Sequence, residues 1–180
     1  MRRGFRRAFR RAMAPDVPPL LQRANELLAS GDFNGAAAAF EQLAQAAEGR
    51  GGPRAPRFFL DAGRVRILAG QTAAGMSHLK HGLELFAVRG ELLHLHRAGQ
   101  RIIAELNLRG LNAEAKEIEA VLTGRLPANF APPAVQAPAR RPILPTHCPS
   151  CGGAVRPDEV EWLDEVTAEC SYCGSPVRGE

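Results

Sequence analysis

Four cysteines, arranged as two Cys-x-x-Cys pairs, constrain the fold of this chain more than any other feature of its sequence. The pairs are Cys148 with Cys151 and Cys170 with Cys173, and the chain contains no other cysteine. The two residues inside each pair form a tight turn that directs both sulfurs toward one ion, and the glycine after each pair suits the backbone angles of this turn. The 18 residues between the pairs fall within the spacing of a four-cysteine zinc site. The sequence therefore predicts one zinc ion bound by four thiolates.

Such a zinc ion is expected to be structural, because four cysteines leave no coordination position for water. A Cys-x-x-Cys pair can also be a thioredoxin-type dithiol, and four thiolates can bind iron. Neither pair opens a helix after a strand, however, and glycine-flanked pairs are typical of metal sites. Residues 14–20 contain two adjacent prolines and an aspartate instead of the apolar segment of a secretory signal. We therefore expect a metal site in a reducing compartment, the cytoplasm, rather than disulfides.

The residues between the two pairs show a strand pattern. Residues 159–162 alternate acidic and apolar side chains, as in a half-buried strand, and residues 164–165 can turn the chain into a second strand at 166–169. Over residues 147–178 this pattern resembles the rubredoxin-like zinc ribbon family. The resemblance implies a small β module whose folding is largely set by the bound metal. Within it we expect Trp162 in the core and Tyr172 as a surface anchor.

Helical spacing of apolar residues extends over residues 18–123, in six segments that are each followed by a glycine. These glycines are Gly31, Gly49, Gly70, Gly90, Gly110 and Gly124. Gly31, Gly70 and Gly110 recur at intervals of 39 and 40 residues, each between a long helix and a second helix. This period predicts three helical hairpins.

The first hairpin carries a recognisable motif, Gly31-Asp32-Phe33-x-x-Ala36-x-x-x-Phe40-x-x-Leu43-Ala44. It resembles the turn and second helix of a tetratricopeptide repeat. The resemblance implies that Ala36 lets two helices approach closely and that Phe40 fills the gap between hairpins. The period exceeds the 34 residues of that family, so both a short solenoid and a non-repetitive bundle remain open. The corresponding residues of the later hairpins are Gly75 with Leu79 and Ala115 with Glu119.

The predicted fold class is mostly α, with three helical hairpins and a small β zinc ribbon. Residues 125–146 are rich in Pro and Ala, cannot sustain a helix and are expected to form a semi-extended linker. The predicted organisation is thus a basic arm at 1–15, a tetratricopeptide-like domain at 16–124, the linker, and the zinc ribbon at 147–180.

The N-terminal arm repeats a four-residue unit over residues 2–13, with arginine pairs separated by small and large apolar residues. At helical spacing this pattern predicts a basic amphipathic helix that suits an anionic membrane surface, an acidic groove of a protein, or nucleic acid. An unstructured basic leader and a mitochondrial transit peptide are alternatives. The candidate binding residues are Arg2, Arg3, Arg6, Arg7, Arg10, Arg11, Phe5 and Phe9.

Charge is distributed unevenly along the chain. The net charge of +4 combines +6 in residues 1–13 with −5 in residues 147–180. The acidic ribbon repels phosphate, so nucleic-acid binding is expected from the arm alone. The same asymmetry suggests that the arm and the ribbon attract one another. No segment approaches the roughly 20 apolar residues of a membrane-spanning helix.

Catalytic signatures are missing from the sequence. It contains no Ser-His-Asp pattern, phosphate-binding loop or dinucleotide fingerprint, and we therefore predict that the chain is not an enzyme and has no small-molecule substrate. His78 and His81 stand three residues apart at helical spacing, as a metal pair would, but no nearby carboxylate completes a site. We expect these histidines on a polar helix face.

The predicted function is a protein–protein adaptor. In the tetratricopeptide family the first helices of the hairpins line the binding groove, and the resemblance implies a polar, basic groove for an acidic protein segment. The implied groove residues are Asn25, Arg57, Arg64, Arg97, Gln100 and Asn107. The alternatives are a transcription or translation factor that binds nucleic acid through the arm, and a membrane-surface tether. The excess of arginine over lysine indicates a GC-rich, bacterial genome.

Overall fold

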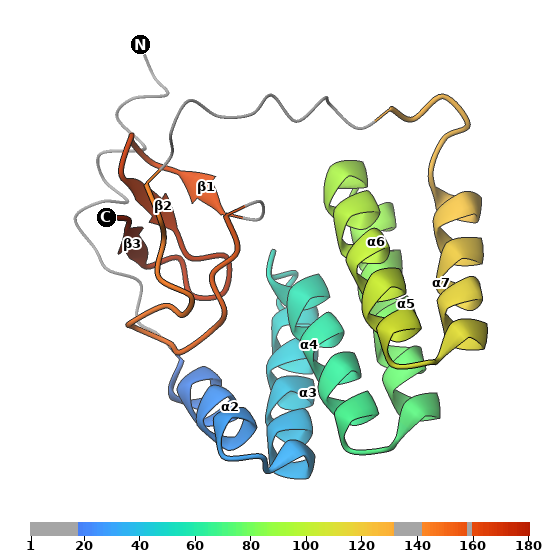
Figure 1. Cartoon of the computed structure of the whole chain (residues 1–180), viewed down its shortest axis with the longest axis horizontal. Helices are drawn as coiled ribbons and strands as arrows, with labels where there is room; N and C mark the ends of the chain where they lie inside the picture. Colours follow the sequence, from blue (N-terminus) through green and yellow to red (C-terminus); the bar gives the residue numbers. More distant parts are fainter. Residues whose placement is uncertain (1–17, 132–141, 158–159) are drawn as a thin grey trace. The chain divides into compact units, whose positions relative to one another are not determined.

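A computed structural model of the chain describes residues 18–131, 142–157 and 160–180 (Figure 1). Within these residues the chain is mostly helical, with six helices and one three-stranded antiparallel sheet, which confirms the predicted fold class. The chain divides into two compact units. Residues 18–30 and the described residues from 142 onward form one, here called the cysteine unit, and residues 31–131 form the other, the helical unit. The first predicted helix thus belongs with the cysteines.

The helices follow the predicted segments. Gly31, Gly70, Gly90 and Gly110 have φ values of +81°, +78°, +70° and +76°, the left-handed conformation that ends a helix. Gly49 is the last residue of its helix as predicted, although the positive φ of +63° falls on Gly51. Gly124 was predicted as a helix end but lies one residue before it, because Leu126 turns extended before Pro127. The helices are α2 (Pro19–Ala29), α3 (Phe33–Gly49), α4 (Ala55–Leu68), α5 (Thr72–Val88), α6 (Leu92–Leu108) and α7 (Asn112–Arg125).

Glycines allow α4 and α5 to approach closely. A Cβ atom added to Gly63 would lie 2.8 Å from the carbonyl oxygen of Gly75, and one added to Gly75 would lie 2.7 Å from that of Gly63. A Cβ atom on Gly82 would lie 2.8 Å from the carbonyl oxygen of Pro56. Since these contacts are with backbone atoms, no side-chain movement can relieve them. Gly75 therefore has the close-approach role expected of the small residue in its hairpin.

The core of the helical unit lies where successive helices pack, and α5 also contacts α7. Phe40 of α3 is 2% exposed and Leu79 of α5 is 1% exposed, so both large residues predicted between hairpins are buried. Glu119, their counterpart on α7, is exposed, and Ile118 is buried instead. In the third hairpin, the buried residue therefore lies one position before the predicted one. None of the described helices has the length and apolar composition needed to span a membrane.

The sheet belongs to the cysteine unit and consists of β1 (Glu161–Trp162), β2 (Thr167–Glu169) and β3 (Pro176–Arg178), in that order. Trp162 pairs with Ala168, and Ala168 pairs with Val177. Ala168 and Val177 are buried while their neighbours along the strands are more exposed, the alternation of a sheet with one covered face. The Asp164 carboxylate closes the β1–β2 turn by accepting the N–H groups of Val166 and Thr167, at 3.0 and 2.7 Å.

The end of the predicted linker is part of the cysteine unit. Ile143 and Glu180 exchange two backbone hydrogen bonds, each 3.1 Å long, and Leu144 is buried. At its other end the predicted linker begins at Arg125, the last residue of α7. Residues 132–141 lie outside the described residues.

Candidate metal centre

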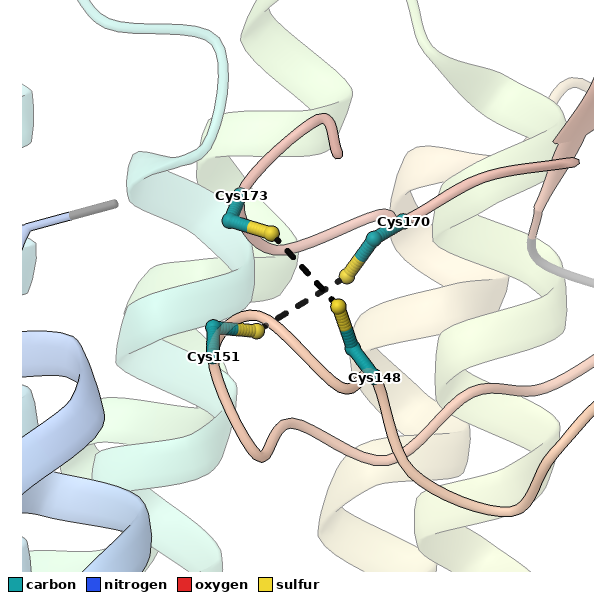
Figure 2. Close-up of side chains that lie close together, drawn as sticks. All are labelled: Cys148, Cys151, Cys170 and Cys173. Carbon is teal, nitrogen blue, oxygen red and sulfur yellow. Dashed lines mark hydrogen bonds between the residues drawn. The ribbon is translucent and has the colours of Figure 1, made fainter. Parts of the chain in front are cut away.

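The four cysteine sulfurs converge on one point (Figure 2). The Sγ atoms of Cys148 and Cys173 lie 3.8 Å apart, those of Cys151 and Cys170 lie 3.9 Å apart, and all four lie within 4.8 Å of one another. A tetrahedron with metal–sulfur bonds of about 2.3 Å has sulfur–sulfur edges of about 3.8 Å. The cluster can therefore hold one metal ion. Among the described residues, no other group of three or more His, Cys, Asp or Glu side chains is so placed.

The first knuckle, residues 148–153, is a tight turn closed by its own backbone. The N–H of Gly152 donates to the carbonyl of Cys148 at 2.9 Å, and the N–H of Cys148 donates to the carbonyl of Gly153 at 2.8 Å. Gly152 has a φ of +72°, a conformation that favours glycine. The N–H of Gly153 points at the Cys151 sulfur, 3.4 Å away, and so stabilises its thiolate form.

The second knuckle, residues 170–175, repeats this construction. Gly174 has a φ of +76° and donates its N–H to the carbonyl of Cys170 at 2.8 Å, while Cys170 donates to the carbonyl of Ser175 at 2.9 Å. The knuckle is also the loop between β2 and β3, since it begins directly after one strand and ends directly before the other. The first knuckle is flanked only by an isolated bridge between His147 and Ala154.

The sulfurs affect one another's protonation. Hydrogen bonding with the sulfurs of Cys170 and Cys173, followed by burial, raises the pKa of the Cys151 thiol above its usual value. The corresponding contacts with Cys151 and Cys170 lower the pKa of Cys173. Protons are thus shared unevenly in a cluster that is almost fully buried. Because a metal ion binds thiolates, it displaces these protons, and metal affinity falls as the pH falls.

Tyr172 was predicted to be a surface anchor, and this prediction is wrong. The residue is only 7% exposed, and a Cβ atom added to Gly153 would lie 2.9 Å from its ring. The tyrosine of the second knuckle therefore covers the backbone of the first and helps to exclude water from the sulfurs. Trp162, expected in the core, is half-buried.

Two residues of α2 contact the first knuckle. The side-chain amide of Asn25 donates to the carbonyl of Cys151 at 2.7 Å, and that of Gln22 donates to the carbonyl of Ser150 at 2.9 Å. Asn25 was predicted to line the helical groove, and Gln22 was not singled out. No sequence signal identified these contacts, because they join residues 126 and 128 positions apart and polar amides follow no periodic pattern.

The arginines of the predicted groove lie on α4 and α6, in different surroundings. Arg64 is largely buried, with its Nε 3.1 Å from a carboxylate oxygen of Glu105 and its Nη1 3.8 Å from Asp61. Arg57 and Arg97 are half-buried close to His94. Burial lowers the pKa of His94, the charges of Arg57 and Arg97 lower it further, and the carboxylate of Glu91, 3.7 Å away, opposes them.

The remaining predicted residues are exposed or lie outside the description. Gln100 and Asn107 of α6 are exposed. A cavity of about 10 Å³ lies beside Arg64, between α4, α5 and α6, and a hollow of about 720 Å³ lies between α5 and α7. Lys80, His81, Glu84, Val121 and Arg125 are among the residues that line this hollow. The arm residues Arg2, Arg3, Arg6, Arg7, Arg10, Arg11, Phe5 and Phe9 lie outside the described residues.

His78 and His81 pair with carboxylates of α3. His78 Nε2 lies 2.9 Å from a carboxylate oxygen of Glu41, and His81 Nε2 lies 2.8 Å from one of Glu48. Glu41 also receives two hydrogen bonds from Arg66, of 2.6 and 2.7 Å. These contacts connect α3, α4 and α5. The histidines thus take part in interhelical hydrogen bonds.

Comparisons of the chain with protein-family models, with curated proteins and with solved structures find no match in any of the three. The fold and the site alone therefore define the class. It is a mostly helical protein with a C-terminal cluster of four buried cysteines that can hold a metal ion.

Proposed function

We propose that this chain is a non-enzymatic protein-binding adaptor whose cysteine unit holds one structural zinc ion. The observation that supports the zinc site is the cluster of four buried sulfurs. Tetrahedral sites with four sulfur ligands are typical of zinc and of iron. With every ligand position occupied by a protein thiolate, the ion has no position for water or substrate and acts by holding the fold.

Metal analysis of the purified chain tests the metal part of this proposal. We expect one equivalent of zinc per chain and no iron, and we expect Cys170→Ser to lose the metal. Bound iron, or a zinc content well below one equivalent in a freshly purified and folded protein, would contradict the structural-zinc site. The free, unbridged state of all four cysteines fits a reducing compartment, and we propose the cytoplasm.

The adaptor part rests on the surface of the helical unit. The positive charges of Arg57 and Arg97, which both act on His94, suit an acidic protein segment, because unlike charges attract at short range. Affinity capture from the native host should recover a partner with the unaltered chain and lose it with Arg57→Glu/Arg97→Glu. Lys116→Glu is the control, since it reverses an exposed charge on α7 in the same unit. Equal capture by all three chains would contradict a basic docking surface on α4 and α6.

The arginine-rich arm supports a rival function, binding of nucleic acid. Six arginines without an acidic residue in residues 1–13 neutralise phosphates, and such binding weakens steeply with salt. Salt-dependent RNA or DNA binding that disappears when residues 1–13 are removed would favour this rival. Co-sedimentation with anionic vesicles would instead favour a membrane-surface tether through the same arm.

A further inference from the structure

The face of α2 that touches the first knuckle presents two amides to two consecutive carbonyls. Gln22 and Asn25 stand three residues apart and thus on the same side of the helix. Their side chains donate to the carbonyls of Ser150 and Cys151, at 2.9 and 2.7 Å. Each is a directional contact between one helix and one turn. Together they set the position and rotation of α2 against that turn.

These carbonyls belong to the turn that aims the sulfurs. The peptide between Cys151 and Gly152 accepts the Asn25 amide at its oxygen and donates its N–H to the carbonyl of Cys148, at 2.9 Å. Since a peptide unit is planar, a hydrogen bond at each end fixes its orientation. The orientation of that peptide helps to set how the two candidate ligands of this knuckle, Cys148 and Cys151, lie relative to each other.

Gly152 also brings the helix and the turn into close contact. A Cβ atom on Gly152 would lie 3.3 Å from the Cβ of Asn25, closer than most real contacts of this kind. The glycine thus serves two purposes, the left-handed turn and the approach of α2. The amide of Asn25 then lies over the knuckle backbone instead of in solvent.

The two knuckles differ in what supports them. The second is continuous with β2 and β3, whereas the first is flanked by the single bridge between His147 and Ala154. In the described residues, α2 provides the first knuckle with two side-chain hydrogen bonds, one from Gln22 and one from Asn25. The first knuckle therefore depends on a helix more than 110 residues earlier in the chain for part of its order.

We propose that α2 is a clasp whose docking on the first knuckle is linked to metal binding at the four cysteines. Metal binding holds the first knuckle in the turn whose carbonyls accept hydrogen bonds from Gln22 and Asn25. Without the ion, the four sulfurs of the two knuckles are no longer linked. The coupling is reciprocal. Docking of α2 raises the affinity of the cysteines for the metal by the same factor by which the bound metal raises the equilibrium constant for docking of α2. Loss of the metal then releases α2. This inference rests on the proposed metal site.

Hydrogen exchange of the full chain tests the metal-to-helix direction. Peptides that cover α2 should exchange at least about tenfold faster after the metal is removed by a chelator, because an undocked short helix is marginal in water. Peptides from α4, in the helical unit, serve as the internal reference and should not change. Equal protection of α2 with and without metal would overturn the clasp.

Chelator competition tests the helix-to-metal direction. We expect Asn25→Ala and Asn25→Asp to bind one equivalent of zinc about tenfold more weakly, the scale typical when partners of metal ligands are removed. Alanine is a better helix former than asparagine, so a loss in Asn25→Ala cannot come from unwinding of α2. Arg23→Ala, an exposed position on the same helix, should bind zinc like the unaltered chain.

The outcomes separate the two proposals. An unaltered chain that takes up no metal would overturn both the zinc site and the clasp. A chain that binds one zinc ion while Asn25→Ala and Asn25→Asp retain its affinity would overturn the clasp alone. Weaker binding in both variants, unchanged binding in Arg23→Ala and metal-dependent protection of α2 together support it.

Discussion

In the helical unit, large side chains such as Phe40, Leu83 and Ile118 are almost fully buried, whereas the described part of the cysteine unit buries fewer of them, among them Leu21, Leu144 and Tyr172, beside the four thiols. Burial of a large apolar side chain contributes about 1.5–3 kcal/mol, so several such residues can stabilise a helical bundle without a ligand. A small module with little apolar core depends instead on cross-links. We therefore expect removal of the metal to unfold the cysteine unit, and truncation of buried apolar side chains to destabilise the helical unit.

The largest expected effect is loss of the metal. Zinc contributes roughly 10–16 kcal/mol of apparent binding free energy to small four-ligand modules. Cys170→Ser, or a strong chelator, should therefore abolish the amide NMR dispersion of residues 142–180 while the resonances of α3 to α7 keep their positions. A Cys170→Ser chain that loses both sets of resonances together would show that the units share one cooperative core.

A core truncation should affect the opposite unit. Phe40→Ala removes a side chain that is 2% exposed and should lower the free energy of unfolding of the helical unit by about 3–5 kcal/mol, measured by urea denaturation. Zinc affinity should not change. Leu108→Ala, at a position 89% exposed, should change stability by no more than about 0.5 kcal/mol. Similar effects of the two substitutions would contradict the assigned core.

Overpacking between α4 and α5 should have an intermediate effect. Gly63→Ala places a methyl group 2.8 Å from a backbone oxygen of α5 and should cost about 1–3 kcal/mol. Gly124→Ala is the matched control, because no atom lies within 4 Å of its Cβ position and alanine favours the helix. Thermal denaturation should show destabilisation of the first variant only. An unchanged melting temperature for Gly63→Ala would mean that the two helices are not in close contact.

Ion pairing of Glu41 should make the helical unit sensitive to acid. The hydrogen bonds from Arg66 are the main cause that lowers the pKa of Glu41, so its contribution to stability is present above its ordinary pKa of about 4.3 and is lost as the pH falls through its folded value. Glu41→Gln should cost about 1–3 kcal/mol at neutral pH and progressively less in acid, as urea denaturation across this range would show. Glu119→Gln, at an exposed position, is the control. A Glu41→Gln penalty that is constant with pH would rule out this carboxylate as the titrating group.

Local sequence patterns predicted the features that depend on a few neighbouring residues. The four cysteines come together because each pair is a self-contained turn, and Gly31 or Gly70 ends a helix because it alone adopts the left-handed conformation there. Contacts between distant segments were not predictable in this way. The side-chain amide of Asn25 donates to the carbonyl of Cys151, 126 residues later, and no periodic pattern in the sequence indicates that contact. The burial of Tyr172 depends likewise on how the second knuckle folds against the first.

The smallest expected effect concerns the basic arm and the acidic ribbon. Residues 1–13 carry +6 and residues 147–180 carry −5, and α2, which follows the arm in sequence, contacts the first knuckle. Opposite charges on exposed segments attract weakly, and roughly 1 M salt shortens the Debye length to about 3 Å. We therefore expect small shifts of ribbon amide resonances when residues 1–13 are deleted at low salt, and none at high salt. Ribbon spectra that are identical with and without residues 1–13 at both salt concentrations would exclude this attraction. That result would not contradict the metal-linked docking of α2, because the contact between α2 and the first knuckle is argued from hydrogen bonds and not from net charge.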